Sequence, residues 1–450
     1  MGRVRGVLAI ACVSAMLTAC SSQADPAPST GSSTSSVTPV NDPAKLTFGV
    51  WGNDTEIAAY DSTVSAYNAS TDLADVTTKS WPSDDAMVQD IESGAPLPDV
   101  FLISRGDLEQ LWSAGAVEPV DDYLDARAVD LGDEYSRAAL EAFSAEHRLQ
   151  CMPYGVSPQV VYYNTDLVDF PRMEATGLEV PGSSNRSWSW DEFNAAAEFA
   201  STARKGARAF WFDQTLTGIA PFVLAGGGKL VNDDQTSLAF SDDSTRGALG
   251  TALGTLRNAA LTLTPQQLAK RSPLDWFKRG RLGMIAGDRS LVPELRQVKS
   301  LHFDVLPFPS IDHAATVGDF TGLCLSKDSK RIEDAADLLV ALSSDQMMTQ
   351  VAQTGYLVPV NQQVALSQDF LQPLEQPLHA DVYSYTVRNM TILPLTHEWD
   401  SLQEAVAQPV HDLFADGPTI DLDALTTEID ETSRTVLPQP SETSSASPEE

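Results

Sequence analysis

One short stretch of the sequence has the composition of a phosphate-binding loop. Residues 225–230 read AGGGKL, and a glycine-rich loop that ends in lysine cradles nucleotide phosphates when it has the full P-loop spacing. This stretch lacks the first glycine at the required distance and the serine or threonine that should follow Lys229. It therefore predicts a turn that leads into a strand, not a nucleotide site.

The other patterns that could carry catalysis or hold a metal ion are also incomplete. The sequence has no HExxH, GxSxG or CxxC motif, and its six histidines are scattered without the spacing of metal ligands. Its 62 acidic residues could supply the paired carboxylates of a glycosidase, but nothing marks two of them as partners. We expect no cofactor, no metal site and no catalysis, with a secreted glycosidase as the enzymatic alternative.

The elements that position any site alternate along the chain. From Lys45 onward, short apolar runs such as KLTFGVW and PDVFLI alternate with helical patterns, which is typical of βαβ units and an α/β fold. Ser189 and Glu192 form a capping box that predicts the start of one helix. At 450 residues and 42% hydrophobic content, the chain is long enough for two lobes.

The charge of the chain limits its partners. The formal net charge is −33 at pH 7, and such a surface repels phosphate backbones and anionic headgroups. We therefore expect neither nucleic-acid binding nor electrostatic docking on a membrane.

The amino terminus predicts an exported lipoprotein. Arg3 and Arg5 precede VLAIACVSAML, a run of signal-peptide length that is too short to span a bilayer. The following LTAC resembles the bacterial lipobox, in which the cysteine takes a diacylglycerol and becomes the first mature residue. We expect a signal peptide at 1–19 and a lipid anchor at Cys20; the alternative is an ordinary signal peptide with a chance cysteine.

Both flanks of the globular part are poor in apolar residues. Residues 20–44 are rich in Ser, Thr and Pro, and residues 438–450 end in SETSSASPEE. Such segments cannot bury enough surface to offset their ordering entropy. They predict a flexible tether after the anchor and a disordered tail, so the protein lies on the extracellular face of the cell membrane.

Several stretches, in order along residues 45–437, match one family. They include FGVWG, LWSAGAVEPVDDYL, CMPYGVSPQVVYYNTDLV, PFVLAGGGKLV, FKRGRLGMI, GLCLSKDSK, GYLVPVNQQ and LPLTHEWDSLQEAV. In these stretches the chain resembles the extracellular solute-binding proteins of ATP-driven importers, in the branch of the maltose and oligosaccharide binders. The resemblance implies a two-lobe periplasmic-binding-protein fold of type II, with discontinuous α/β lobes, hinge strands between them and a ligand in the cleft.

The resemblance also implies lobe boundaries. It places residues 45–152 and about 323–370 in the amino-terminal lobe, and residues 153–322 and about 371–437 in the carboxy-terminal lobe. Cys151 and Cys324 fall one in each crossing strand, so they either form a disulfide that clips the hinge or remain two buried free thiols.

A sugar site needs aromatic platforms for C–H faces and polar groups for hydroxyls. The loops that match the family's cleft supply both, and core packing is the alternative for each aromatic residue. The candidate ligand-binding residues are Trp51, Asn53, Asp54, Ser104, Arg105, Tyr154, Asp288, Arg289, Asp319, Phe320, Tyr356 and Trp399.

Two departures from the family pattern bear on the ligand. Asp288, Arg289 and Ser290 form a charged turn where the family often has an aromatic residue, which indicates hydrogen bonds to ligand hydroxyls, an ionic group on the ligand, or an inter-lobe salt bridge. The segment before Pro221 lacks the aromatic cluster of maltose binders. A smaller or differently branched glycoside is therefore favoured over a maltodextrin.

The resemblance implies a monomeric, non-enzymatic receptor. It would capture a carbohydrate outside the cell by cleft closure and deliver it to the membrane subunits of an ABC permease. The alternative ligands are a polyamine, a glycerophosphodiester or a peptide, and an ionic ligand would bind more weakly at high salt.

Overall fold

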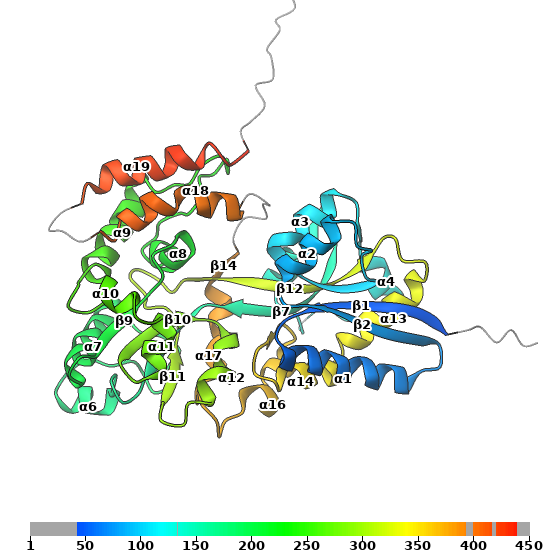
Figure 1. Cartoon of the computed structure of the whole chain (residues 1–450), viewed down its shortest axis with the longest axis horizontal. Helices are drawn as coiled ribbons and strands as arrows, with labels where there is room; N and C mark the ends of the chain where they lie inside the picture. Colours follow the sequence, from blue (N-terminus) through cyan, green and yellow to red (C-terminus); the bar gives the residue numbers. More distant parts are fainter. Residues whose placement is uncertain (1–42, 133, 393–398, 416–419, 439–450) are drawn as a thin grey trace, which may run out of the picture. The chain divides into compact units, whose positions relative to one another are not determined.

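The computed structural model describes residues 43–132, 134–392, 399–415 and 420–438. The predicted anchor, tether and tail, apart from a few residues at their inner ends, lie outside this part. Strands and helices alternate along it and form two large sheets (Figure 1). One hydrophobic core covers the larger sheet and continues onto one face of the smaller sheet, and a second core covers the other face of the smaller sheet. No helix in these ranges is both long and apolar enough to cross a membrane, and no group of three His, Cys, Asp or Glu side chains in them is arranged to hold a metal ion.

The larger sheet has eight strands in the order β13-β7-β12-β3-β1-β2, with β4 and β14 also paired to β12. The first βαβ units give parallel pairing of β1 with β2 and β3, whereas β12 runs antiparallel to β3 and β7. The strands are β1 (Ala44–Trp51), β2 (Ala74–Trp81), β3 (Val100–Ser104), β4 (Val117–Glu118), β7 (Cys151–Pro158), β12 (Thr316–Ser326), β13 (Val358–Pro359) and β14 (Met390–Ile392). A short hairpin pairs β5 (Ser144–Ala145) with β6 (Arg148–Leu149).

The helices of the larger lobe are amphipathic or capped as their sequences dictate. In α13, Ala335, Leu338, Leu339 and Leu342 recur at helical spacing and are all buried in the core of this lobe. The helices are α1 (Asp54–Ser70), α2 (Asp84–Glu92), α3 (Arg105–Ser113), α4 (Asp121–Ala126), α5 (Arg137–Ala142), α13 (Ile332–Leu342), α14 (Asp345–Ala352), α15 (Gln362–Ala365) and α16 (Gln368–Leu371).

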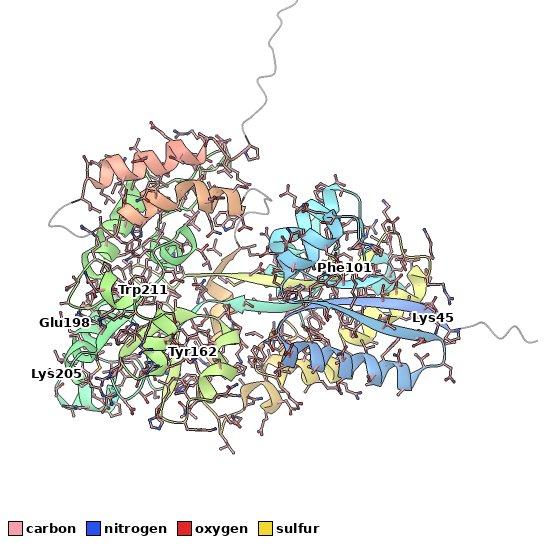
Figure 2. All side chains as sticks on the ribbon, viewed as in Figure 1. Lys45, Phe101, Tyr162, Glu198, Lys205 and Trp211 are labelled. Atoms are coloured by element: carbon pink, nitrogen blue, oxygen red, sulfur yellow. A yellow bond between two sulfur atoms is a disulfide. The ribbon has the colours of Figure 1, made fainter. Side chains whose placement is uncertain are left out.

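The smaller sheet has the order β11-β8-β10-β9, from β8 (Val160–Asn164), β9 (Arg208–Trp211), β10 (Leu282–Gly287) and β11 (Phe303–Leu306). Its core is aromatic, because Phe193, Phe210 and Phe212 pack ring against ring. Phe101 of β3 in the larger sheet and Tyr162 of β8 in the smaller sheet are fully buried (Figure 2).

Helices from two distant parts of the sequence cover the smaller sheet. They are α6 (Phe170–Ala175), α7 (Trp190–Ala203), α8 (Leu216–Ala225), α9 (Asp243–Leu256), α10 (Pro265–Leu268), α11 (Pro273–Lys278), η1 (Arg289–Leu291), α12 (Val292–Arg296), α18 (Trp399–Asp412) and α19 (Leu422–Ser433). The carboxylate of Asp430 in α19 accepts hydrogen bonds from the main-chain N–H groups of Phe240 and Ser241 at 2.7 and 2.8 Å. The carboxy-terminal helices therefore belong to the smaller lobe.

The chain passes between the lobes at Gln159, the single residue between β7 and β8. Its N–H donates to the Val317 carbonyl at 3.0 Å, and its carbonyl accepts from the Thr316 hydroxyl at 2.8 Å. The return strand β12 and the short β14 lie beside this crossing, and α17 (Asp381–Thr386) with η2 (Val387–Asn389) leads into β14 (Figure 1).

In β7 this crossing point comes after a local irregularity between Pro153 and Gly155. That segment does break the regular pairing, because the register shifts between Thr321 and Gly322 on the opposite strand. The strand nevertheless continues to Pro158 in the larger sheet.

At Gly318 the three crossing strands approach so closely that only glycine fits. A Cβ atom there would lie 2.5 Å from the Ser157 carbonyl oxygen and 2.6 Å from the Met390 sulfur. At this point of the hinge, the main chain of β7 and the Met390 side chain both pack directly against Gly318.

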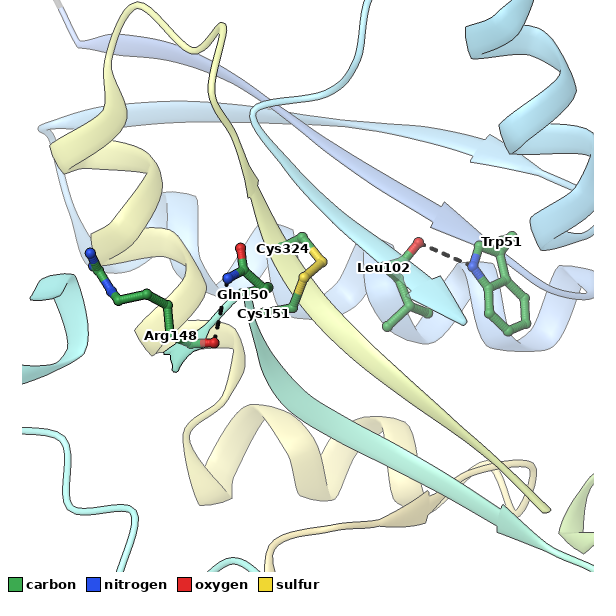
Figure 3. The surroundings of a disulfide bond; sticks show 6 residues. All are labelled: Trp51, Leu102, Arg148, Gln150, Cys151 and Cys324. Atoms are coloured by element: carbon green, nitrogen blue, oxygen red, sulfur yellow. Dashed lines mark hydrogen bonds between the residues drawn. A yellow bond between two sulfur atoms is a disulfide. The ribbon is translucent and has the colours of Figure 1, made fainter. Parts of the chain in front are cut away.

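A disulfide joins β7 to β12 within the larger sheet (Figure 3). Cys151 and Cys324 are directly paired in the antiparallel register, their Cα atoms lie 4.4 Å apart, and both are fully buried. The outgoing strand β7 and the return strand β12 are thus covalently linked on the side of the larger lobe.

Candidate ligand-binding cleft

A cleft of about 500 Å³ lies between the two lobes and the crossing strands. The larger lobe contributes Asp84, Asp85, Ser104, Arg105, Gly106, Asp107 and Gln110. The crossing strands contribute Ser157, Gln159, Val317, Gly318, Asp319 and Ile392, and the smaller lobe contributes Thr217, Asp288, Trp399 and Asp400.

The wall from the larger lobe follows from its parallel strands. The strands β2 and β3 end at Trp81 and Ser104, and the helices α2 and α3 begin directly beyond them. In α/β sheets, ligands bind outside these carboxyl ends. Ser83 caps α2 by accepting from the N–H of Ala86 at 3.2 Å, which fixes the first turn of α2 at the cleft.

The opposite wall is the amino-terminal end of α18. Trp399 is half-buried, packs against the core of the smaller lobe and still reaches the cleft. The Thr217 hydroxyl of α8 donates to the Gln403 side chain of α18 at 2.6 Å, so the two helices are held together. Among the described residues that line the cleft, Trp399 is the one aromatic side chain.

The charge of the cleft is strongly negative. Its described lining contains six aspartates, Asp84, Asp85, Asp107, Asp288, Asp319 and Asp400, against the single guanidinium of Arg105. Burial lowers the pKa of Arg105, while Asp319 and Glu109 act to raise it.

The pKa of Asp107 rises to about 6. Burial is the largest cause, followed by the charge of Asp84, and the charges of Asp85 and Asp400 act in the same direction. A hydrogen bond from the Ser104 hydroxyl, 3.0 Å long, partly offsets them. The carboxylates of α2, α3 and α18 therefore act on each other across the cleft.

The pKa of Asp319 rises further, to about 7. Protein surrounds this side chain on most sides, although water still reaches it through the cleft, and the resulting desolvation is the main cause. The hydrogen bond from the Phe320 main chain and the charge of Arg105 lower the pKa, whereas Asp84 and Asp107 raise it. Near neutral pH both the protonated and the ionised form of this carboxyl group are therefore populated.

Five of the twelve candidate residues line the cleft: Ser104, Arg105, Asp288, Asp319 and Trp399. The other seven lie outside its lining: Trp51, Asn53, Asp54, Tyr154, Arg289, Phe320 and Tyr356.

Local structure explains the positions of the three candidates after β1. The Trp51 indole N–H donates to the Leu102 carbonyl at 3.1 Å, which turns the ring onto the neighbouring strand (Figure 3). Asn53 caps α1 by accepting from the N–H groups of Thr55 and Glu56. Asp54 is the exposed first residue of that helix.

The aromatic candidates of the crossing and return segments are core or peripheral residues. Tyr154 is 2% exposed and packs against the ring of Tyr60. Phe320 is 1% exposed and faces a separate cavity of about 260 Å³. Tyr356 is half-buried.

The side chains of Asp288 and Arg289 in the charged turn point in different directions. Asp288 faces the cleft, whereas Arg289 is fully buried. Arg289 stacks over the rings of Phe370 and Tyr383, at 4.6 and 5.2 Å, and its guanidinium donates to main-chain carbonyls of the larger lobe. Sequence left three alternatives for this turn, one of them an inter-lobe salt bridge. Among the described residues Arg289 makes no salt bridge and instead contacts carbonyl oxygens of the other lobe.

Several lining residues were missed by sequence reasoning. Asp84 and Asp85 begin the helix after β2, and Asp107 follows β3, so the rule that selected Ser104 and Arg105 could have found them. Asp400 directly follows the predicted Trp399. Ser157, Gln159 and Thr217 carry no such local signal, because the hinge and the packing of α8 against α18 bring them to the cleft.

The chain matches the family model of the bacterial extracellular solute-binding proteins over residues 62–375. Its fold is also that of solved two-lobe binding proteins. An ABC substrate-binding protein from Listeria monocytogenes in complex with cycloalternan has a TM-score of 0.72 at 18% identity, over 88% of this chain and 99% of that one. The sugar-binding protein MalE from Xanthomonas citri has a TM-score of 0.73 at 16% identity, over 87% of this chain and 97% of that one.

A third comparison gives the same architecture. The cyclic alpha-maltosyl-1,6-maltose binding protein from Arthrobacter globiformis has a TM-score of 0.70 at 17% identity, over 88% of this chain and 99% of that one. At these identities the likeness establishes the fold.

Proposed function

Because this chain belongs to the bacterial extracellular solute-binding proteins, we propose that it binds a carbohydrate in the cleft and delivers it to an ABC permease. The observation that carries this proposal is the pairing of one aromatic platform with many hydrogen-bonding groups. Trp399 offers a ring face for the C–H side of a sugar, and Ser104, Gln110 and Ser157 offer hydroxyl and amide partners.

The solved relatives support the same ligand class. Similar binding proteins have been solved with cycloalternan, maltotriose and maltose bound. The cleft volume of about 500 Å³ is in the usual range of small-molecule sites, ~300 to 1,000 Å³.

The hinge supplies the means of capture. Both lobes line the cleft, so a ligand that contacts both of them favours the closed arrangement. The apparent affinity then depends on how readily the crossing strands at Gln159 and Gly318 allow closure. A permease that contacts both lobes would distinguish the loaded, closed receptor from the empty one.

The proposed location completes this function. Cys20 carries the lipid anchor and the segment expected from sequence at 20–44 forms the tether up to the start of β1 at Ala44, so a monomeric receptor works on the extracellular face of the cell membrane. The lobe boundaries expected from sequence, 45–152 with about 323–370 and 153–322 with about 371–437, remain part of the proposal. In the structure the chain passes from the larger sheet to the smaller sheet at Gln159 and returns to the larger sheet near Thr316.

Calorimetric titration with mono-, di- and oligosaccharides tests the proposal. We expect saturable binding of at least one glycoside and a loss of at least tenfold in affinity in Trp399→Ala. Trp276→Ala is the matched control, because Trp276 is a half-buried tryptophan of the smaller lobe outside the cleft. Binding of a peptide or polyamine with no response to any sugar would overturn the carbohydrate assignment, and chemical conversion of the bound sugar would indicate the glycosidase alternative.

A further inference from the structure

The acidic side chains of the cleft come from both lobes and from the strand between them. Asp84, Asp85 and Asp107 lie on α2 and α3, Asp319 on β12, and Asp400 on α18. The charge of Asp400 acts on both Asp85 and Asp107. These five carboxylates therefore share one space, which becomes smaller when the lobes close.

None of these five aspartates forms an ion pair with a described basic side chain, although the charge of Arg105 acts on Asp319. No lysine, arginine or histidine in the described ranges lies within 4.0 Å of any of them, whereas Asp75, Asp90 and Asp121 elsewhere in the larger lobe each form an ion pair. Asp107 accepts one hydrogen bond, from the Ser104 hydroxyl. Within the described part of the chain, the negative charge of the cleft is therefore balanced only in part.

Helix ends account for part of this arrangement but not for all of it. Asp84, Asp85, Asp107 and Asp400 each lie in the first turn of a helix, where a carboxylate is favoured by the helix dipole. Three helix amino termini at ~0.5 charge each, with Arg105, offset about two to three of the six lining carboxylates. Asp319 is in the middle of a strand and gains nothing from a helix end.

A neutral ligand leaves this repulsion in place. Closure brings Asp400 towards the carboxylates of α2 and α3, and like charges in a partly desolvated space oppose each other. A cation between the two walls replaces that repulsion with charge-assisted hydrogen bonds from each side. An anionic ligand such as a glycerophosphodiester would add to the repulsion.

The remaining lining indicates that the cation is attached to a sugar. Trp399 provides a stacking face, and Gln110, Ser157, Gln159 and Thr217 provide neutral hydrogen-bonding groups over the rest of the cleft. A bare polyamine would leave these groups unused. We propose that the ligand is an amine-bearing glycoside whose ammonium group lies among Asp107, Asp319 and Asp400. This inference rests on the carbohydrate-binding function proposed above.

A matched pair of ligands tests the charge of the sugar. Purified protein is titrated in a calorimeter with glucosamine, galactosamine and their di- and trisaccharides, and with the N-acetylated form of each, which has the same skeleton without the charge. At pH 7.5 and low salt we expect at least one amine to bind tenfold or more tightly than its acetylated partner. This ratio should shrink at 0.5 M salt, because screening weakens the ionic contact.

Variants locate the ammonium. Asp107→Asn and Asp319→Asn should each weaken amine binding at least fivefold and change binding of the acetylated partner less than twofold. Asp54→Asn, an exposed aspartate outside the cleft, is the control and should change neither. Circular dichroism checks that each variant is folded, and the salt titration of the unaltered protein does not depend on the variants.

The outcomes distinguish a failure of the proposed ammonium contact from a failure of the carbohydrate-binding function. Acetylated or neutral sugars that bind as well as the amines would overturn the inference and leave the carbohydrate function standing. Spermidine binding without any sugar response would overturn the carbohydrate function, and with it the amine-bearing glycoside. Aminated sugars that bind no better than their partners, including the case in which neither binds, also overturn the inference.

Discussion

The Nη2 atom of Arg289 donates a hydrogen bond of 3.0 Å to the main-chain carbonyl of Phe370. Arg289 follows β10 of the smaller lobe, whereas Phe370 is part of α16 in the larger one. The same guanidinium donates from Nε to the Gly355 carbonyl at 3.2 Å, while its Nη1 atom is buried without a partner among the described residues. One side chain therefore connects the two lobes on the side of the hinge away from the cleft lining.

Replacing this contact should shift the balance between open and closed forms. In Arg289→Met, two inter-lobe hydrogen bonds are lost, so we expect a larger open population and a several-fold weaker apparent ligand affinity. Small-angle scattering should show a larger radius of gyration without ligand. Arg208→Met is the control, because Arg208 donates to the Ala260 carbonyl at 3.1 Å within one lobe. Equal effects of the two substitutions would contradict an inter-lobe role.

Adding one methyl group at the crossing should destabilise the protein. In Gly318→Ala the new Cβ would meet the Ser157 carbonyl oxygen at 2.5 Å, and a main-chain atom cannot move away cheaply. We expect a loss of about 1–3 kcal/mol in the free energy of unfolding, measured with urea.

Gly247→Ala is the matched control for this substitution. Gly247 is in α9, and a Cβ added there would have nothing within 4 Å, so alanine should raise the free energy of unfolding by about 0.5–1 kcal/mol. A loss of stability at both positions would indicate that crowding at the hinge is not the cause.

Removing the disulfide should lower stability through the unfolded state. The bond joins residues 173 positions apart, and a loop of that length restricts the unfolded chain strongly. We expect the double variant Cys151→Ala/Cys324→Ala to lose about 2–5 kcal/mol in free energy of unfolding. Urea titrations of the unaltered protein with and without reductant should give a similar difference. Two free thiols found by mass spectrometry on unreduced protein would contradict the bond.

The aspartates of the cleft should make stability fall as pH rises. The pKa values of Asp107 and Asp319 are raised to about 6 and 7 from an ordinary value of 3.8, so the folded state binds their protons more tightly than the unfolded state. Their contribution is full below about pH 4 and is lost as pH rises towards 7. Asp319→Asn should raise the free energy of unfolding at pH 7.5 by about 1 kcal/mol, a modest value because water in the cleft screens the charge.

Urea unfolding at pH 4.5 and 7.5 measures this effect. The variant should differ little from the unaltered protein at the lower pH and more at the higher one. Asp54→Asn should show no such pH-dependent gain. A larger gain at pH 4.5 would contradict the assigned sign.

The sequence alone was sufficient to predict the family, the fold class and several helices and strands. The α/β alternation is confirmed, and β1 and β3 lie where KLTFGVW and PDVFLI predicted them. The capping box of Ser189 and Glu192 begins α7 as expected. These features are local, since strand alternation and helix capping depend on residues only a few positions apart.

The cleft was harder to predict because side-chain direction depends on tertiary packing. Trp51 and Trp399 both appeared suited to stack on a sugar, but Trp51 turns to the Leu102 carbonyl and only Trp399 lines the cleft. Asp84 and Asp400 are distant in sequence, and only the approach of α2 and α18 places them at one cavity. The sequence showed that the chain is acidic, but it did not show that six aspartates line the cleft.

The bond between Cys151 and Cys324 also determines how the protein responds to cleavage. All four strands of the smaller sheet, from Val160 to Leu306, lie within the covalent ring that this bond closes. A protease that cuts once in any loop between the two cysteines would leave both fragments joined as one molecule. Such a nicked receptor would keep both lobes until a reductant opened the ring. A cut after Cys324 and before α18 and α19 would instead leave a carboxy-terminal fragment with no covalent bond to the rest, held in place only by its packing.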